Sequence, residues 1–314
     1  MARRIALLAM LACAATTLAA AKVWRLDNVQ NADFSTAQEA HAAAESGDTL
    51  YVAGSVNNYG SFTLTKQLTV IGPGYFLAQN PQTQAGLNAA TFSGLVFNAG
   101  SEESVAMGLT TTGDFDIRIN GVTLRRNKSN RDIFTRTGVD NVVIAQNYVA
   151  RQLNVGGSNS NILALNNIFP NTVDSSRPSI TAPNTSSLQI GNNTMVNSIT
   201  VSNSTISSNI VTSGTISGSE DNNSLTDNLV LDANADLSTV FVNEGSPDAL
   251  WKLAANSAAL GGGLNGVDQG AFGGPNPYVL SGVPNIPSIY FFTAPALGSS
   301  QSGLQVQLKA KGNN

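Results

Sequence analysis

Residues 117–230 repeat one short pattern six times: an aliphatic residue, two further residues, asparagine, one residue and an apolar residue. The copies place asparagine at Asn120, Asn147, Asn166, Asn193, Asn209 and Asn228. Successive asparagines are 27, 19, 27, 16 and 19 residues apart. A recurrence near twenty residues, built from short β-prone runs and turn residues, is typical of a solenoid. Because asparagine tolerates the left-handed turn conformation and stacks well, we expect these six residues to form an internal ladder.

The composition agrees with stacked strands. Only 11% of the residues are charged, whereas about a quarter is usual, and 42% are hydrophobic, enough for a sizeable core. Uncharged polar side chains can align from rung to rung and hydrogen-bond, whereas stacked like charges repel.

The coarse secondary structure is all-β after one helix. Residues 35–46 predict a helix, with a capping box formed by Ser35 and Gln38, an alanine-rich interior and Gly47 as its C-terminal cap. We expect this helix to cover the open end of the solenoid. From residue 48 to about 245 there is no helical periodicity, and apolar and polar residues alternate in short runs such as 62–71. About nine coils are expected over this span, and the longer asparagine gaps predict turns that bulge outward.

Two segments carry a family resemblance. Gly47-Asp-Thr-Leu-Tyr-Val52, followed by the run from Phe62 to Gly74, resembles the opening of right-handed parallel β-helix proteins of the pectin-lyase-like superfamily. The run from Asn256 to Gly273 resembles the closing segment of exported bacterial members. The resemblance covers about residues 22–290 and implies a right-handed parallel β-helix solenoid with an N-terminal capping helix. It does not select a function, because this fold hosts lyases, hydrolases, adhesins and binding proteins.

The first 21 residues predict a secretory signal peptide. Arg3 and Arg4 precede a short apolar run, and Ala19-Ala-Ala21 offers a cleavage site that would leave Lys22 first. Cys13 offers an alternative lipoprotein acceptor site. We therefore expect a secreted or cell-surface protein. Cys13 is the only cysteine, so the mature chain would have no disulfide.

Two regions should follow the signal peptide. Residues 22–272 form the β-helix domain with its cap, and residues 273–314 form a proline-rich extended tail. Within the tail, prolines punctuate residues 273–297, so we expect that stretch to hydrogen-bond poorly to its neighbours. Alternation over 304–310 predicts one final strand, which either pairs along the rod or awaits a partner.

The basic residues gather in one part of the chain. Asp116 and Arg118 alternate with the apolar Phe115, Ile117 and Ile119, so both should face outward. We expect neighbouring coils to bring a glycan-binding flank together from the following residues: Asp116, Arg118, Arg125, Arg126, Arg131, Arg136 and Arg151. The alternatives are a solvated salt-bridge network and the active site of a lyase for acidic glycans.

Several functions are disfavoured by what the chain lacks. His41 is the only histidine and no Asp-Asp pair occurs, so the paired carboxylates of a glycosidase are not recognisable. No metal site and no cofactor are predicted. Removing residues 1–21 changes the formal charge from −4 to −6, which argues against nucleic acid as a partner, and no later run predicts a membrane span.

The leading hypothesis is therefore an exported, non-catalytic β-helix protein with a rigid surface for polysaccharide binding, adhesion or envelope structure. The possible partner is an acidic polysaccharide. A polysaccharide lyase and a structural assembly subunit are the alternatives, and the oligomeric state is not predicted.

Overall fold

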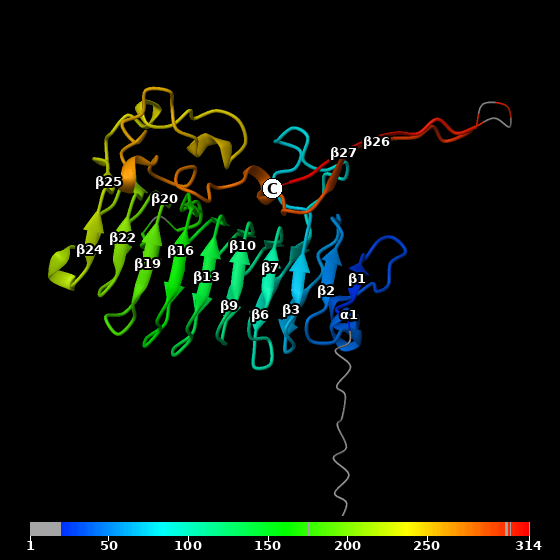
Figure 1. Ribbon diagram of the computed structural model, residues 1–314, viewed down its shortest axis with the longest axis horizontal. Coiled ribbons are helices and arrows are strands. Elements are labelled where there is room, and N and C mark those ends of the chain that lie inside the picture. The colour runs from blue at the N-terminus through cyan, green and yellow to red at the C-terminus, as the bar shows by residue number, and fades with distance from the viewer. Residues whose placement is uncertain (1–19, 175, 299–300, 302, 314) are drawn as a thin grey trace, which may run out of the picture.

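Three parallel sheets wind into one rod in the computed structural model, which describes residues 20–174, 176–298, 301 and 303–313. The predicted all-β, right-handed parallel β-helix is confirmed (Figure 1). Most of the predicted signal peptide, 1–21, lies outside the described residues.

Each full coil passes through the three sheets in the same order, A, C and B. Sheet A consists of β1 (Val23–Leu26), β2 (Thr49–Val52), β4 (Thr69–Ile71), β7 (Val105–Met107), β10 (Thr123–Arg125), β13 (Val142–Ala145), β16 (Ile162–Leu165), β19 (Leu188–Gly191), β22 (Thr205–Ser207) and β24 (Ser224–Thr226). Sheet C consists of β5 (Thr91–Phe92), β8 (Thr110–Thr111), β11 (Lys128–Ser129), β14 (Tyr148–Val149), β17 (Ile168–Phe169), β20 (Thr194–Met195), β23 (Ile210–Val211) and β25 (Leu229–Val230). Sheet B consists of β3 (Ser61–Leu64), β6 (Gly94–Phe97), β9 (Phe115–Ile117), β12 (Ile133–Thr135), β15 (Leu153–Val155), β18 (Ile180–Thr181) and β21 (Ile199–Thr200).

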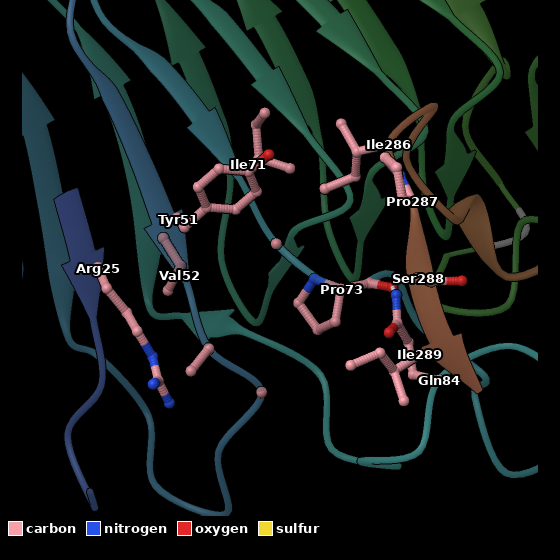
Figure 2. Close-up of a pocket in the computed structure, with 13 residues that line it drawn as sticks. Arg25, Tyr51, Val52, Ile71, Pro73, Gln84, Ile286, Pro287, Ser288 and Ile289 are labelled. Carbon is pink, nitrogen blue, oxygen red and sulfur yellow. Dashed lines mark hydrogen bonds between the residues drawn. The ribbon is translucent and has the colours of Figure 1, made fainter. Parts of the chain in front are cut away.

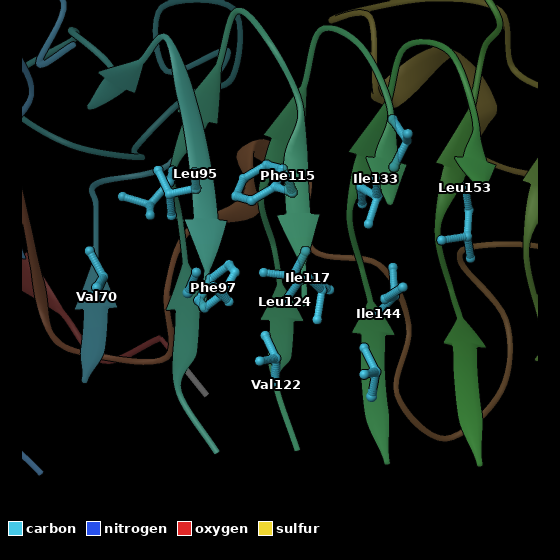
Figure 3. Close-up of a cluster of buried hydrophobic side chains, with 14 of the residues drawn as sticks. Val70, Leu95, Phe97, Phe115, Ile117, Val122, Leu124, Ile133, Ile144 and Leu153 are labelled. Atoms are coloured by element: carbon cyan, nitrogen blue, oxygen red, sulfur yellow. The ribbon is translucent and has the colours of Figure 1, made fainter. Parts of the chain in front are cut away.

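The core is a continuous column of stacked apolar side chains inside these sheets (Figure 3). In sheet B the register places Leu95 beside Phe115, Phe115 beside Ile133 and Ile133 beside Leu153. All four side chains are fully buried. Because side chains alternate between the two faces along a strand, the neighbours of these residues on each strand point outward and form the solvent-facing surface of sheet B.

The capping helix is shorter than predicted. Helix α1 spans Ala37–Ala43, and its N-cap is Thr36, whose hydroxyl accepts a hydrogen bond from the Glu39 backbone N–H. The predicted cap at Ser35 was therefore one residue early, and the C-terminal cap is Ala44 rather than Gly47. Ala37 and Ala40 are buried against the first rung, which covers this end of the apolar column.

An asparagine ladder fills the corner between sheets A and C. Its members are Asn127, Asn147, Asn167, Asn193, Asn209 and Asn228. The Asn147 Oδ1 accepts from the backbone N–H and from the Nδ2 of Asn127, at 2.9 and 3.2 Å. The Asn147 Nδ2 also donates to the Leu124 carbonyl at 2.9 Å, so the amide is satisfied in the interior.

Two of the asparagines named from the sequence are not in this ladder, so the predicted register was wrong there. Asn120 is exposed at another corner, where its Oδ1 accepts from the Asp140 N–H, and Asn127 takes the ladder position. Asn166 precedes the ladder residue Asn167 and has a φ of 54°. The ladder gaps are thus 20, 20, 26, 16 and 19 residues, closer to one coil than the pattern suggested.

The residue before each ladder asparagine points away from the core and contacts a later segment of the chain that runs along the outside of the rod. Five such residues have a φ between 52° and 58°: Arg126, Gln146, Asn166, Asn192 and Ser208. Their side chains contact residues 264–283, here called the strap. Ser208 accepts a hydrogen bond from the Leu264 backbone N–H. Asn192 donates to the Asp268 carbonyl, and Asn166 donates to the Gly273 carbonyl. Gln146 donates to the Pro277 carbonyl, and Arg126 donates to the Val283 carbonyl.

The chain therefore reverses after β25 and runs back along the rod (Figure 1). Short 3-10 helices punctuate the late part of the chain: η1 (Ser219–Asp221), η2 (Leu237–Thr239), η3 (Ala249–Trp251), η4 (Leu264–Gly266) and η5 (Leu280–Gly282). Beyond the strap, β26 (Ser288–Thr293) and β27 (Gln307–Lys311) pair as an antiparallel hairpin. The predicted final strand thus pairs with the tail itself, and 288–293 is a strand rather than the poorly bonded stretch expected there.

We predict that Asn147→Ala lowers the free energy of unfolding by about 2–4 kcal/mol, because the Asn127 N–H and the Leu124 carbonyl each lose their Asn147 partner inside the rod. Asn120→Ala should change it by less than about 0.5 kcal/mol, because Asn120 is exposed. Urea unfolding followed by circular dichroism measures both. Equal effects of the two substitutions would contradict the ladder assignment.

Candidate functional site

The outer face of sheet B carries the best-defined group of charged side chains. The register aligns Asp116 of β9 with Phe134 of β12, and Phe134 with Asn154 of β15. Phe115 and Ile117 are fully buried on the inner face, so Asp116 points outward as predicted.

Asp116 is held by two arginines from adjacent coils. Arg118 donates from Nε and Nη2 to Asp116 Oδ2 at 2.9 and 2.7 Å, and Arg136 donates to Oδ1 and Oδ2 at 2.6 and 2.9 Å. The carboxylate is 9% exposed, whereas the side chains of Arg118 and Arg136 are 46% and 52% exposed. One carboxylate thus neutralises only one of two accessible guanidinium groups, which leaves a net positive charge at this point.

The protonation states of this cluster follow from its geometry. Burial by itself would raise the pKa of Asp116, but the hydrogen bonds from Arg136 and Arg118 outweigh it and hold the pKa below its ordinary value. The same hydrogen bond raises the pKa of Arg136. Both groups are therefore ionised, and Arg136 is a poor candidate for a general base.

A second charged group lies at the other ends of the same strands. The Arg151 Nε is 2.8 Å from Asp132 Oδ1, and the Asp132 side chain is 1% exposed. The angle is not that of a hydrogen bond, and neither Asp132 oxygen has a hydrogen-bond partner among the described residues. Burial raises the pKa of Asp132, and Arg151 offsets this only in part. Arg131 reaches Asp114 at 3.9 Å and is 53% exposed.

Arg125 and Arg126 do not belong to this face, which corrects the predicted single flank. Both donate from Nε to Gln146 Oε1, at the corner between sheets A and C. Arg126 is 5% exposed because the strap covers it, and its Nη1 donates to the Val283 carbonyl. The structure therefore brings Asp116, Arg118 and Arg136 together, with Arg131 and Arg151 at the opposite ends of the strands.

Sequence reasoning missed two outward-facing residues of this surface. Phe134 is half-buried beside Asp116, and the Arg136 guanidinium carbon lies 5.0 Å from its ring centroid. Asn154 continues the row on the next coil. The alternation of Ile133, Phe134 and Thr135 was a usable signal, because an aromatic residue at an outward position is unusual on a polar face.

A cavity lies elsewhere, where the tail leaves the rod (Figure 2). It has a volume of about 490 Å³, and Tyr51, Ile71 and Pro73 of the first coils face Ile286 and Ile289 across it. Arg25 at its edge is paired with Asp27 at 3.1 Å. The described residues that line this cavity include no aspartate or glutamate, the residues that supply the acid–base pair of a glycosidase.

Two further findings concern the described part of the chain. Within it, no three histidine, cysteine, aspartate or glutamate residues are grouped closely enough to hold a metal ion. No helix there has the length and apolar character needed to cross a membrane.

Comparison of the chain with protein-family models, with curated proteins and with solved structures finds no match. The fold and the surface chemistry are therefore the grounds on which a function can be proposed for this protein.

Asp116→Asn should lower the free energy of unfolding at pH 7 by about 1–2 kcal/mol, between the values for exposed and buried ion pairs. Because the folded-state pKa of Asp116 lies below 3.8, its contribution is present above about pH 4 and is lost as the pH falls through the folded-state pKa. Urea unfolding between pH 7 and pH 3 should show a smaller acid destabilisation in the variant than in the wild type. The exposed Asp232, replaced by Asn, is the control, and an identical pH profile for Asp116→Asn would contradict the assignment.

Proposed function

We propose that this protein is an exported, non-catalytic β-helix protein that binds acidic polysaccharide on the outer face of sheet B. The observation that carries the proposal is the sharing of Asp116 by two half-exposed arginines, Arg118 and Arg136. A carboxylate of the ligand could bind the unneutralised guanidinium group through two parallel hydrogen bonds.

The shape of this surface favours a polymer over a small molecule. Small ligands bind in concave, mostly apolar pockets, whereas the sheet B face is an extended row of rungs about 4.8 Å apart. Phe134 supplies an apolar ring within the row, and Asn154 supplies hydrogen-bonding groups on the next coil. An extended ligand could thus contact several coils at once.

The protonation states favour binding over catalysis. A lyase needs a base to remove a proton, and the hydrogen bond to Asp116 keeps Arg136 protonated. A glycosidase needs two accessible carboxylates, and Asp132 is covered. The acidic-glycan lyase, predicted as an alternative from the same arginines, therefore ranks second.

Membership of the pectin-lyase-like superfamily is part of the proposal. Its support is the three-sheet coil with an asparagine ladder at one corner, together with the sequence segments that resemble that superfamily.

Export has support at the first described rung. The Lys22 backbone N–H donates to Asp48 Oδ1 at 2.7 Å, and the Trp24 Nε1 donates to Asp48 Oδ2 at 2.8 Å. Cleavage after Ala21 would turn the Lys22 nitrogen into an α-ammonium group, and the contact with Asp48 would gain a charge. The predicted cleavage site thus lies just before β1.

Binding is tested by affinity electrophoresis in gels containing polygalacturonate, a uronate polymer, with neutral dextran as the comparison. Wild type should be retarded by polygalacturonate only. Arg118→Gln and Arg136→Gln should each weaken binding about tenfold, the effect of losing roughly 1.4 kcal/mol. Arg25→Gln is the matched control, because Arg25 is 55% exposed and paired with Asp27 away from the outer face of sheet B.

Equal retardation of all four proteins would refute the proposal. Ultraviolet absorbance from unsaturated uronate products separates the lyase alternative. If the wild type forms this product and Arg136→Gln does not, the protein is a lyase and the non-catalytic proposal is wrong.

Processing is tested by the mass of the protein recovered after export. We expect a chain that begins at Lys22. A chain that begins at Cys13 and carries lipid would support the lipoprotein alternative instead.

A further inference from the structure

The two ends of the rod differ. At the N-terminal end, α1 and the contact between Trp24 and Phe34 cover the first rung. At the other end, β24 and β25 are the last strands of sheets A and C in the described chain. Leu225 and Val230 on these strands are 43% and 46% exposed. With Ile216 they line an open cavity of about 400 Å³.

None of the residues described after β25 folds back over this open end. After β25 it packs Val240 and Phe241 against Ile210 on the side of sheet C, and it then returns along the rod as the strap. An uncovered end of stacked strands presents unpaired backbone groups and apolar side chains, which is a template for another strand.

The opposite end of the molecule carries a hairpin with exposed apolar side chains. The β26–β27 hairpin extends past the N-terminal end of the rod, away from the open end (Figure 1). Its side chains include Ile289, Phe292 and Leu308, which are 44%, 56% and 53% exposed. In the described chain its two strands form a sheet of their own, and the Ala85 N–H, which donates to the Ile289 carbonyl, holds only the base of the hairpin.

The charges of the two surfaces are complementary. No aspartate or glutamate follows Asp268, and the hairpin carries Lys309 and Lys311. Residues 178–251, which include the last coils, contain seven acidic residues and no lysine or arginine. Three of the acids, Glu220, Asp221 and Asp227, lie in the final turn of the rod, beside the open end.

We infer that the hairpin of one molecule covers the open end of a second copy of this chain. The contact joins two different surfaces at opposite ends of the molecule, so it is heterologous and repeats head to tail. The apolar hairpin side chains cover Ile216, Leu225 and Val230, and the lysines face the acidic final coil. This inference is independent of the proposed glycan binding, because neither surface includes the outer face of sheet B.

The test uses the full purified chain, with mass measured by analytical ultracentrifugation over a range of concentrations. Wild type should form species heavier than the monomer, which is 32.5 kDa before any cleavage, and the association should weaken at high salt. Phe292→Asp with Leu308→Asp, and separately Leu225→Asp with Val230→Asp, should each weaken association at least tenfold. Val56→Asp, at a 78% exposed site on the first coils, is the matched control and should associate like the wild type.

A mixture of the two double variants tests whether the two proposed surfaces bind each other. Each double variant keeps one of the two surfaces, so an equimolar mixture should form a dimer and nothing longer. A dimer in the mixture also shows that both variants are folded, and circular dichroism checks each one alone.

Three results would overturn the inference: a monomeric wild type at all concentrations, unchanged association of the Leu225 and Val230 variant, or a mixture that stays monomeric while both variants are folded. Binding of the monomer to vesicles of anionic lipid, lost in the hairpin variant, would instead assign the hairpin to a membrane.

Discussion

The stacking of backbone turns on one another is the constraint on which this structure depends. A coil must change direction between sheets A and C while its amide groups stay out of water, and an unpaired buried amide is costly. The asparagine ladder resolves this problem with one side chain per coil. Asn147 accepts from the coil before it and returns a hydrogen bond to that coil's carbonyl at Leu124. This corner fixes the register between coils, so that the apolar residues of neighbouring rungs stack on one another and the alternate residues point outward.

The same corner also organises the outside of the rod. The residue before each ladder asparagine adopts a positive φ and turns its side chain away from the core, where residues such as Gln146 and Asn166 bind the strap. The interior ladder and the strap are therefore two consequences of one turn geometry. Because the strap holds the late chain against the side of the rod, it carries the hairpin to the N-terminal end and leaves β24 uncovered.

Charge has two different roles on this surface. Asp132 and Arg151 are nearly covered, and they form a structural pair at the amino ends of the sheet B strands. Asp116 lies beneath two arginines that remain accessible, and that unequal pairing gives the surface a chemical preference. The salt-bridge network and the proposed binding patch, which appear as alternatives in the sequence, thus lie at different ends of the same strands. A rigid scaffold makes such a patch useful, because ligand binding then requires little ordering of the protein.

Sequence periodicity alone determined the solenoid, its parallel sheets and the outward direction of Asp116, because these follow from local alternation repeated at the length of one coil. It could not decide between Asn120 and Asn127, or between Asn166 and Asn167, because both members of each pair lie near a turn. The coils have unequal lengths, so only their stacking in the folded protein shows which asparagine side chain meets the asparagine of the next coil. The separation of Arg126 from Arg136 was likewise decided by tertiary structure, since the strap that buries Arg126 arrives from more than 150 residues away along the chain.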